Sequence, residues 1–197
     1  MQLRHFRIIF ALTCISLLSA CSRDGRDMQE PSADQQESIA VTTTAGAEIT
    51  PVGSFALTPT WAEGAQLDAR FTCDAGVSPG LTFQNVASDI VTLALSIVDE
   101  TANNSVQWIV ANIEPTETVL VEGSVPTGAI EATNSLGTIG FAAPCPPAGE
   151  THSYRLTGYG LSQQLDLENG VDSATLIQAI ELAALDTQSS SFIVTSN

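Results

Sequence analysis

Two side chains that can bind a small anion, His152 and Tyr154, lie two residues apart in the sequence HSYRLTGY. Side chains two positions apart in a strand point to the same face, so a strand here would bring both to one site. An imidazole and a phenol can each donate a hydrogen bond to an oxyanion. Such bonds to a charged acceptor contribute about 1.5 to 3 kcal/mol. The pair therefore indicates a binding site for a small polar or anionic ligand.

The segment that leads into this strand, from Asn134 onward, is a loop rich in glycine and proline. Its glycines permit backbone conformations that other residues resist, while its prolines fix φ and stiffen the chain. Ordering such a loop costs conformational entropy, which favours a functional role in a ligand pocket. These residues are Gly137, Gly140, Gly149, Pro144, Pro146 and Pro147.

Strand patterns dominate the part of the chain that must position this site. The run IVTLALSIV, residues 90–98, is almost continuously apolar and predicts a strand buried on both faces. Residues 107–113, 154–161 and 191–195 also predict strands. Asp172 to Thr175 predict the N-terminal cap of a helix that runs to about residue 185. We expect a mainly β domain, whose topology periodicity alone does not separate from an immunoglobulin-like sandwich.

Four sequence blocks resemble the phosphatidylethanolamine-binding protein family, whose bacterial members are often called Raf-kinase-inhibitor-like. The blocks are WAEGAQLDARFTCDAGVSPGL (61–81), SIVDE (96–100), VQWIVANI (106–113) and the Gly/Pro loop that ends in HSY. They occur in the family's order. The resemblance implies a large, mostly antiparallel sheet packed on a smaller sheet, with one or two peripheral helices and a pocket at one end.

The resemblance also implies which residues form the pocket. His152 and Tyr154 match the family's second histidine and its tyrosine, and Pro147 matches the loop proline. Glu100 stands in for the first aspartate of the family's acidic motif, and Gln107 occupies the place of its first histidine. The family pocket holds a phosphate or a phosphorylated headgroup. We therefore expect an anionic or phospholipid-headgroup-like ligand.

Three departures from the family pattern leave a second interpretation open. Ala102 replaces the second acidic residue of the motif, and Gln107, unlike histidine, cannot become cationic near neutral pH. Ala143 replaces a glycine of the family's loop. The pocket could then be vestigial and the protein a regulator that inhibits a protease or kinase-like partner. Glu100 could also be a solvated charge, and Tyr154 a core aromatic residue.

The first 20 residues predict a lipoprotein signal peptide. Arg4 and Arg7 precede an apolar run, residues 8–18, and Leu-Ser-Ala-Cys then forms a lipobox that ends at Cys21. We expect cleavage before Cys21 and lipidation of its thiol, with an uncleaved or ordinary secretory signal as the alternative. The expected location is the cell envelope, on the inner or outer membrane and facing the periplasm or the surface. Residues 21–46 predict a flexible tether, and residues 47–197 a single domain.

The charge balance of the chain disfavours nucleic acid as a partner. The net charge is −16, lysine is absent, and the domain from residue 47 onward carries only Arg70 and Arg155 as permanent cations. Binding phosphates along a nucleic acid requires a basic surface. Broad electrostatic adhesion to anionic lipid is disfavoured for the same reason.

The cysteines and the single histidine of the domain limit the chemistry further. Cys73 and Cys145 remain after removal of Cys14 with the signal and lipidation of Cys21; they could pair or stay reduced. One histidine and no Cys-x-x-Cys pair argue against a zinc site, and we expect no metal or cofactor.

Catalysis has little support in the sequence. No Gly-x-Ser-x-Gly element is present, and Asp99 and Glu100 are adjacent in a predicted strand, so they face opposite sides. The sequence favours a non-enzymatic binding domain.

Overall fold

The computed structural model describes residues 53–196. The predicted signal peptide, Cys21 and the tether lie outside these residues. Within the described part, no helix is long and apolar enough to cross a membrane.

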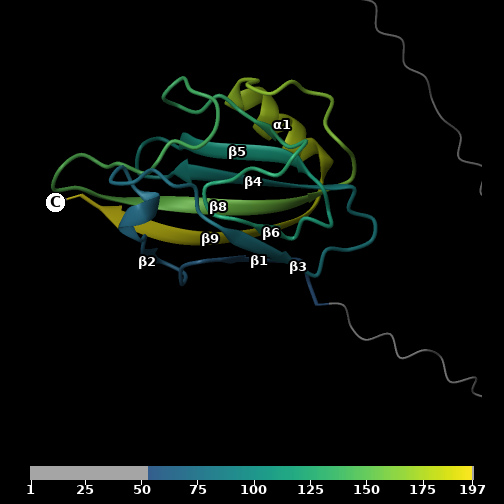
Figure 1. Ribbon diagram of the computed structural model, residues 1–197, viewed down its shortest axis with the longest axis horizontal. Helices are drawn as coiled ribbons and strands as arrows, with labels where there is room; N and C mark the ends of the chain where they lie inside the picture. Colours follow the sequence, from purple (N-terminus) through teal and green to yellow (C-terminus); the bar gives the residue numbers. More distant parts are fainter. Residues whose placement is uncertain (1–52, 197) are drawn as a thin grey trace, which may run out of the picture. The chain divides into compact units, whose positions relative to one another are not determined.

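The described residues form two β-sheets and one α-helix (Figure 1). The smaller sheet is antiparallel, with strand order β1-β3-β6. The larger sheet has the order β2-β9-β8-β4-β5-β7, and only β2 pairs in parallel, with β9. The small-sheet strands are β1 (Ala56–Pro59), β3 (Leu81–Gln84) and β6 (Val119–Leu120). The large-sheet strands are β2 (Ala65–Gln66), β4 (Thr92–Asp99), β5 (Ser105–Ile113), β7 (Ile130–Glu131), β8 (Thr151–Leu161) and β9 (Ala184–Thr195). The expected mainly β, two-sheet architecture is confirmed.

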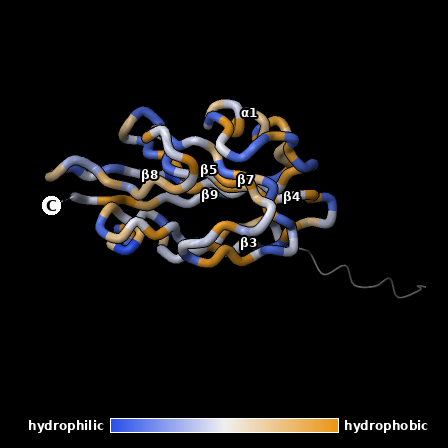
Figure 2. Tube along the Cα trace, turned by 45° about the horizontal axis from the view of Figure 1, so that its top comes forward, coloured by the Kyte–Doolittle hydropathy of each residue, from blue (hydrophilic) through white to orange (hydrophobic). Residues whose placement is uncertain are grey.

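The main core lies between the two sheets, and a second core lies under helix α1 (Ser173–Ala183). Strand β4 is buried on both faces because Leu95 and Ile97 face the small sheet while Ala94 packs in the core below α1. Figure 2 shows orange, hydrophobic segments near β3 and β4 and blue, hydrophilic segments in several of the outer loops. The predicted doubly buried strand is therefore confirmed, but it covers Thr92–Asp99 rather than residues 90–98, and Val91 before it is exposed.

A glycine in β8 allows the small sheet to approach the large one. A Cβ atom added to Gly158 would lie 3.0 Å from Phe83 and 3.2 Å from Leu57 of the small sheet. Contacts this short leave no room for a side chain without movement of the packed layer. Gly158 therefore helps to close the sandwich above the central strands.

The helix begins where the sequence predicts, but the strand after it is longer than predicted. Asp172 Oδ1 accepts the backbone N–H of Thr175 at 2.9 Å, as expected of a cap. The helix ends at Ala183, and β9 follows at once and runs to Thr195, whereas the sequence predicts only residues 191–195. The side chains in the first part of β9 are mostly exposed, and most of them are polar. This part pairs with β8 through its backbone, but its sequence shows no apolar alternation that would predict a strand.

A disulfide joins Cys73 to Cys145, with Cα atoms 5.3 Å apart. The short 3₁₀ helix η2 (Ala69–Phe71) precedes Cys73, and Cys145 belongs to the proline-rich loop before β8. The backbone N–H of Cys73 also bonds to the carbonyl of Pro144 at 3.3 Å. These contacts fix the proline-rich loop against the segment after β2.

Removing this disulfide should destabilise the domain. The bridge spans 72 positions, and in the chain-entropy model a loop of this length contributes about 4 kcal/mol. We expect Cys73→Ala with Cys145→Ala to lower the free energy of unfolding by about this amount, measured by urea denaturation. Reductant should destabilise the unmodified protein similarly and leave the double variant unchanged. Equal stability of the two proteins would contradict a structural role for the bridge.

Candidate functional site

The candidate site is centred on a buried contact between His152 of β8 and Asp99 at the end of β4. The two strands pair antiparallel, with Asp99 opposite Tyr154. His152 Nδ1 lies 2.7 Å from Asp99 Oδ2, and the two residues are 8% and 4% exposed. Asp99 Oδ1 accepts the backbone N–H groups of Thr101 and Ala102, each at 3.0 Å. The turn after β4 thus fixes the carboxylate, and the carboxylate fixes the imidazole.

The second ring nitrogen of His152 contacts another carboxylate. His152 Nε2 lies 3.2 Å from Glu150 Oε2, whose side chain is 58% exposed. An ionised carboxylate only accepts hydrogen bonds, so two such neighbours favour the imidazolium, which donates from both nitrogens. The hydrogen bond to Asp99 raises the pKa of His152 most; burial opposes it, and Glu150 adds to the increase. Both contacts therefore favour the protonated form of the ring.

Tyr154 lies beside His152 on the same face of β8, as its position in the sequence predicts. The two ring centroids are 6.4 Å apart, and the Tyr154 ring stacks on Phe192 of β9 at 5.1 Å. Burial, with the Asp99 charge adding to it, raises the pKa of the Tyr154 phenol well above its usual range. The phenol is therefore neutral, and its buried ring supports the wall of the site.

Two other site residues expected from the sequence, Glu100 and Gln107, form no hydrogen bond with His152. Glu100 pairs with Arg155, whose Nε lies 2.7 Å from Glu100 Oε1, on the sheet face opposite His152. Asp99, and not Glu100, supplies the carboxylate that contacts His152. Gln107 lies at a bulge in β5, and its Nε2 donates to the carbonyl and Oγ of Ser105, both at 3.3 Å.

Pro147 is exposed and acts on the site through the turn that it begins. Its carbonyl accepts the backbone N–H of Glu150 at 3.0 Å. Gly149 completes the turn with φ of 82°, a left-handed conformation that favours glycine. The turn places Glu150 directly before β8 and two residues from His152.

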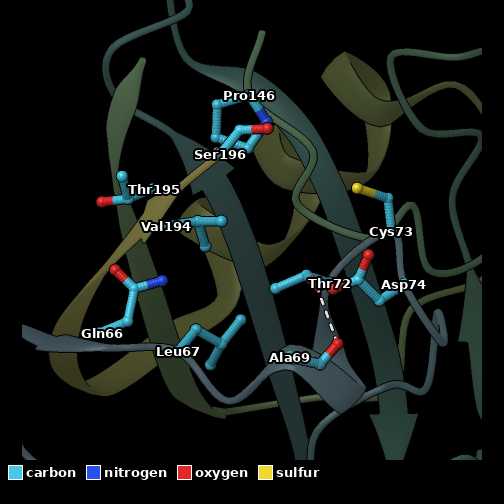
Figure 3. Close-up of a pocket in the computed structure, with 10 residues that line it drawn as sticks. All are labelled: Gln66, Leu67, Ala69, Thr72, Cys73, Asp74, Pro146, Val194, Thr195 and Ser196. Atoms are coloured by element: carbon cyan, nitrogen blue, oxygen red, sulfur yellow. Dashed lines mark hydrogen bonds between the residues drawn. The ribbon is translucent and has the colours of Figure 1, made fainter. Parts of the chain in front are cut away.

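A cavity of about 400 Å³ lies near His152 and Glu150 (Figure 3). Val194 of β9 lines it and pairs directly with His152 across the β8–β9 ladder, so both side chains lie on one face of the sheet. His152 itself is not part of the lining. In Figure 3, Pro146 and Ser196 lie together at one end, and Thr72 and Asp74 lie near Cys73. The lining consists of Gln66, Leu67, Ala69, Thr72, Cys73, Asp74, Pro146, Val194, Thr195 and Ser196.

Three functional candidates were missed by sequence reasoning: Asp99, Glu150 and the polar lining of the cavity. Strand alternation offered a signal for Asp99, because it continues the face of Leu95 and Ile97. Glu150 lies in a turn, where no periodicity applies. The cavity depends on the fold that brings η2 beside β9. The described residues hold no cluster of three or more His, Cys, Asp or Glu side chains suited to a metal ion.

Comparison with known proteins assigns the family. The family model for phosphatidylethanolamine-binding protein matches residues 57–194. The chain is 36% identical over 180 residues to a Mycobacterium tuberculosis protein, LppC, provisionally described as a lipoprotein, with 88% of this chain and 87% of that protein covered. It is also 36% identical over 124 residues to a UPF0098 protein of Methanothermobacter thermautotrophicus, which covers 59% of this chain and 82% of that protein.

Solved structures agree with this assignment. A Chlamydia trachomatis chain described as a phosphatidylethanolamine-binding protein homologue matches with a TM-score of 0.67 and 27% identity, over 73% of this chain and 99% of that one. Escherichia coli YbcL, described as a member of the mammalian family, shares the fold with a TM-score of 0.68 and 23% identity, over 74% of this chain and 100% of that one. The chain belongs to the phosphatidylethanolamine-binding protein family.

The raised pKa of His152 should make the stability of the domain depend on pH. A group whose pKa is higher in the folded than in the unfolded state stabilises the fold when it is protonated. This stabilisation is complete below the unfolded pKa, which is about 6.5 for histidine, and is lost as pH rises through the folded pKa. We expect the difference in unfolding free energy between the unmodified protein and His152→Gln to shrink as pH rises above about 6.5. Urea denaturation at a series of pH values measures it. A difference that stays constant or grows with pH would refute the imidazolium.

Proposed function

We propose that this protein is a non-enzymatic binding protein that holds a small anionic or polar ligand, such as phosphate or a phospholipid headgroup, beside His152. The observation that carries the proposal is the buried His152, whose ring nitrogens contact Asp99 and Glu150, beside the cavity that Val194 lines. Asp99 fixes the ring through Nδ1, and the cavity begins at Val194, the residue opposite His152 on β9. A positive charge with a fixed direction is a suitable donor for an oxyanion.

The volume and lining of the cavity support a small ligand. Its volume of about 400 Å³ lies within the range of small-molecule sites. Leu67 and Val194 supply apolar surface, Thr72, Gln66 and Ser196 supply neutral polar groups, and Asp74 supplies a carboxylate. Such a mixed lining suits a headgroup that carries both a phosphate and a short carbon chain.

The contacts of His152 support binding rather than hydrolysis. Both of its ring nitrogens contact carboxylates, so the only histidine in residues 53–196 has no serine or cysteine nucleophile as a partner. A general base must reach the proton it removes. With both ring nitrogens engaged by carboxylates, neither is free to take a proton from a nucleophile.

We further propose that the domain is attached to the cell envelope by a lipid on Cys21. The match to the LppC protein covers 88% of this chain, more than residues 47–197 make up, so it begins before residue 47. The lipobox that ends at Cys21 is the sequence's own signal for the anchor. The anchor would hold the domain, through the tether, on the inner or outer membrane.

Calorimetry with inorganic phosphate and phosphoethanolamine tests the proposed binding. We expect saturable binding to the purified protein in nonionic detergent, and a loss of affinity of about tenfold or more in His152→Gln, since a charged hydrogen bond is removed. Arg155→Gln is a matched control, because it removes a cation on the opposite face of the same strand. This variant should bind as the unmodified protein does.

Absence of saturable binding at millimolar ligand would contradict the proposed ligand. It would favour the other interpretation, a regulator of a protease or kinase-like protein partner. Equal loss of affinity in His152→Gln and Arg155→Gln would place binding outside the site.

A further inference from the structure

We propose that Glu150 is a built-in competitor, a tethered carboxylate that occupies Nε2 of His152 and limits the access of external anions to it. This inference rests on the proposed function, because it concerns how tightly the same site binds its ligand. It identifies a residue that sets affinity and ligand preference.

Only one atom of the imidazole is available to an external acceptor. Nδ1 is committed to Asp99, whose buried carboxylate also accepts two backbone N–H groups and cannot leave without stranding them. Nε2 is therefore the only ring nitrogen that a ligand can reach. Glu150 Oε2 already lies 3.2 Å from this atom.

Glu150 is the partner that can be displaced. Its contact with the ring is 3.2 Å, compared with 2.7 Å for Asp99, and its side chain is 58% exposed, compared with 6%. Within residues 53–196, its carboxylate has no hydrogen bond other than the one to His152. Water can solvate this carboxylate when it swings away, so displacement leaves no buried charge unpaired on Glu150.

The backbone keeps the displaced side chain close to the ring. Glu150 N donates to the carbonyl of Pro147, and the Glu150 carbonyl accepts the N–H of Ser196 at 3.0 Å. Gly149 N donates to the Ser196 carbonyl at 2.9 Å, so the segment is anchored on both sides. A group tethered this closely competes at a high effective concentration. An external anion must also approach against the charge of Glu150.

The position of Ser196 links this contact to the cavity. Ser196 lines the cavity together with Val194, and its backbone holds Gly149 and Glu150. Glu150 is thus held by the backbone of a residue that lines the cavity, although neither Glu150 nor His152 is itself part of the lining. A ligand in the cavity that presents an oxyanion to Nε2 would replace the Glu150 carboxylate.

Glu150→Gln tests this inference with inorganic phosphate as the probe. The substitution keeps the size of the side chain and removes its charge. Because Glu150 is largely exposed and water screens its charge, the contact contributes little, and we expect phosphate affinity to rise by about two- to fivefold. Glu181→Gln on the exposed surface of α1 is the matched control and should bind like the unmodified protein. Equal or weaker binding in Glu150→Gln would overturn the inference, because a purely supporting residue would weaken binding when lost.

A second measurement tests the same contact without any ligand. Diethylpyrocarbonate acylates neutral, accessible imidazole, so Glu150→Gln should increase the rate of modification of His152, with His152→Gln providing the background. An unchanged rate would overturn the inference even if phosphate binds. If no variant binds phosphate, the proposed function fails, and the modification rate alone then decides whether Glu150 covers Nε2.

Discussion

The buried carboxylate of Asp99 is the constraint on which the site depends. A carboxylate removed from water must be paired, and Asp99 meets this requirement with two backbone N–H groups and the imidazole of His152. Loss of any partner would leave a buried charge partly unsatisfied. The same contact orients the ring, raises its pKa and directs Nε2 outward. One pairing thus determines both the stability of this end of the sheet and its chemistry.

The rest of the fold holds these two residues in register. The β4–β8 ladder places Asp99 opposite Tyr154, and Tyr154 stacks on Phe192 of β9, so three strands support one side of the ring. The disulfide from Cys73 to Cys145 fixes the loop that leads into β8. The central sheet provides the rigid base, while the exposed turn before His152 supplies the adjustable group, Glu150. The imidazole of His152 therefore contacts the buried Asp99 through one nitrogen and the exposed Glu150 through the other.

The sequence predicted the parts of this site that depend on local rules. Strand period placed His152 and Tyr154 on one face, and capping chemistry located the start of the helix at Asp172. The family resemblance pointed to Glu100 as the site carboxylate, and strand alternation indicated only that Asp99 shares a face with Leu95 and Ile97. The contact of Asp99 with His152 depends on the register between strands more than 50 residues apart. Glu150 was not predicted as a site residue, because it lies in a turn, where no strand or helix periodicity applies. The polar half of β9 was missed because its exposed side chains show no apolar alternation.

The protonation state of His152 tests the central claim most directly. Nitrogen-15 spectra of the imidazole, assigned with His152→Gln, report whether each ring nitrogen carries a proton. At about pH 6.5 an ordinary histidine is half protonated, whereas the contacts with Asp99 and Glu150 predict a ring with both nitrogens mostly protonated. A ring that is half protonated or less at this pH, with one nitrogen bare, would contradict the imidazolium and the binding site built around it.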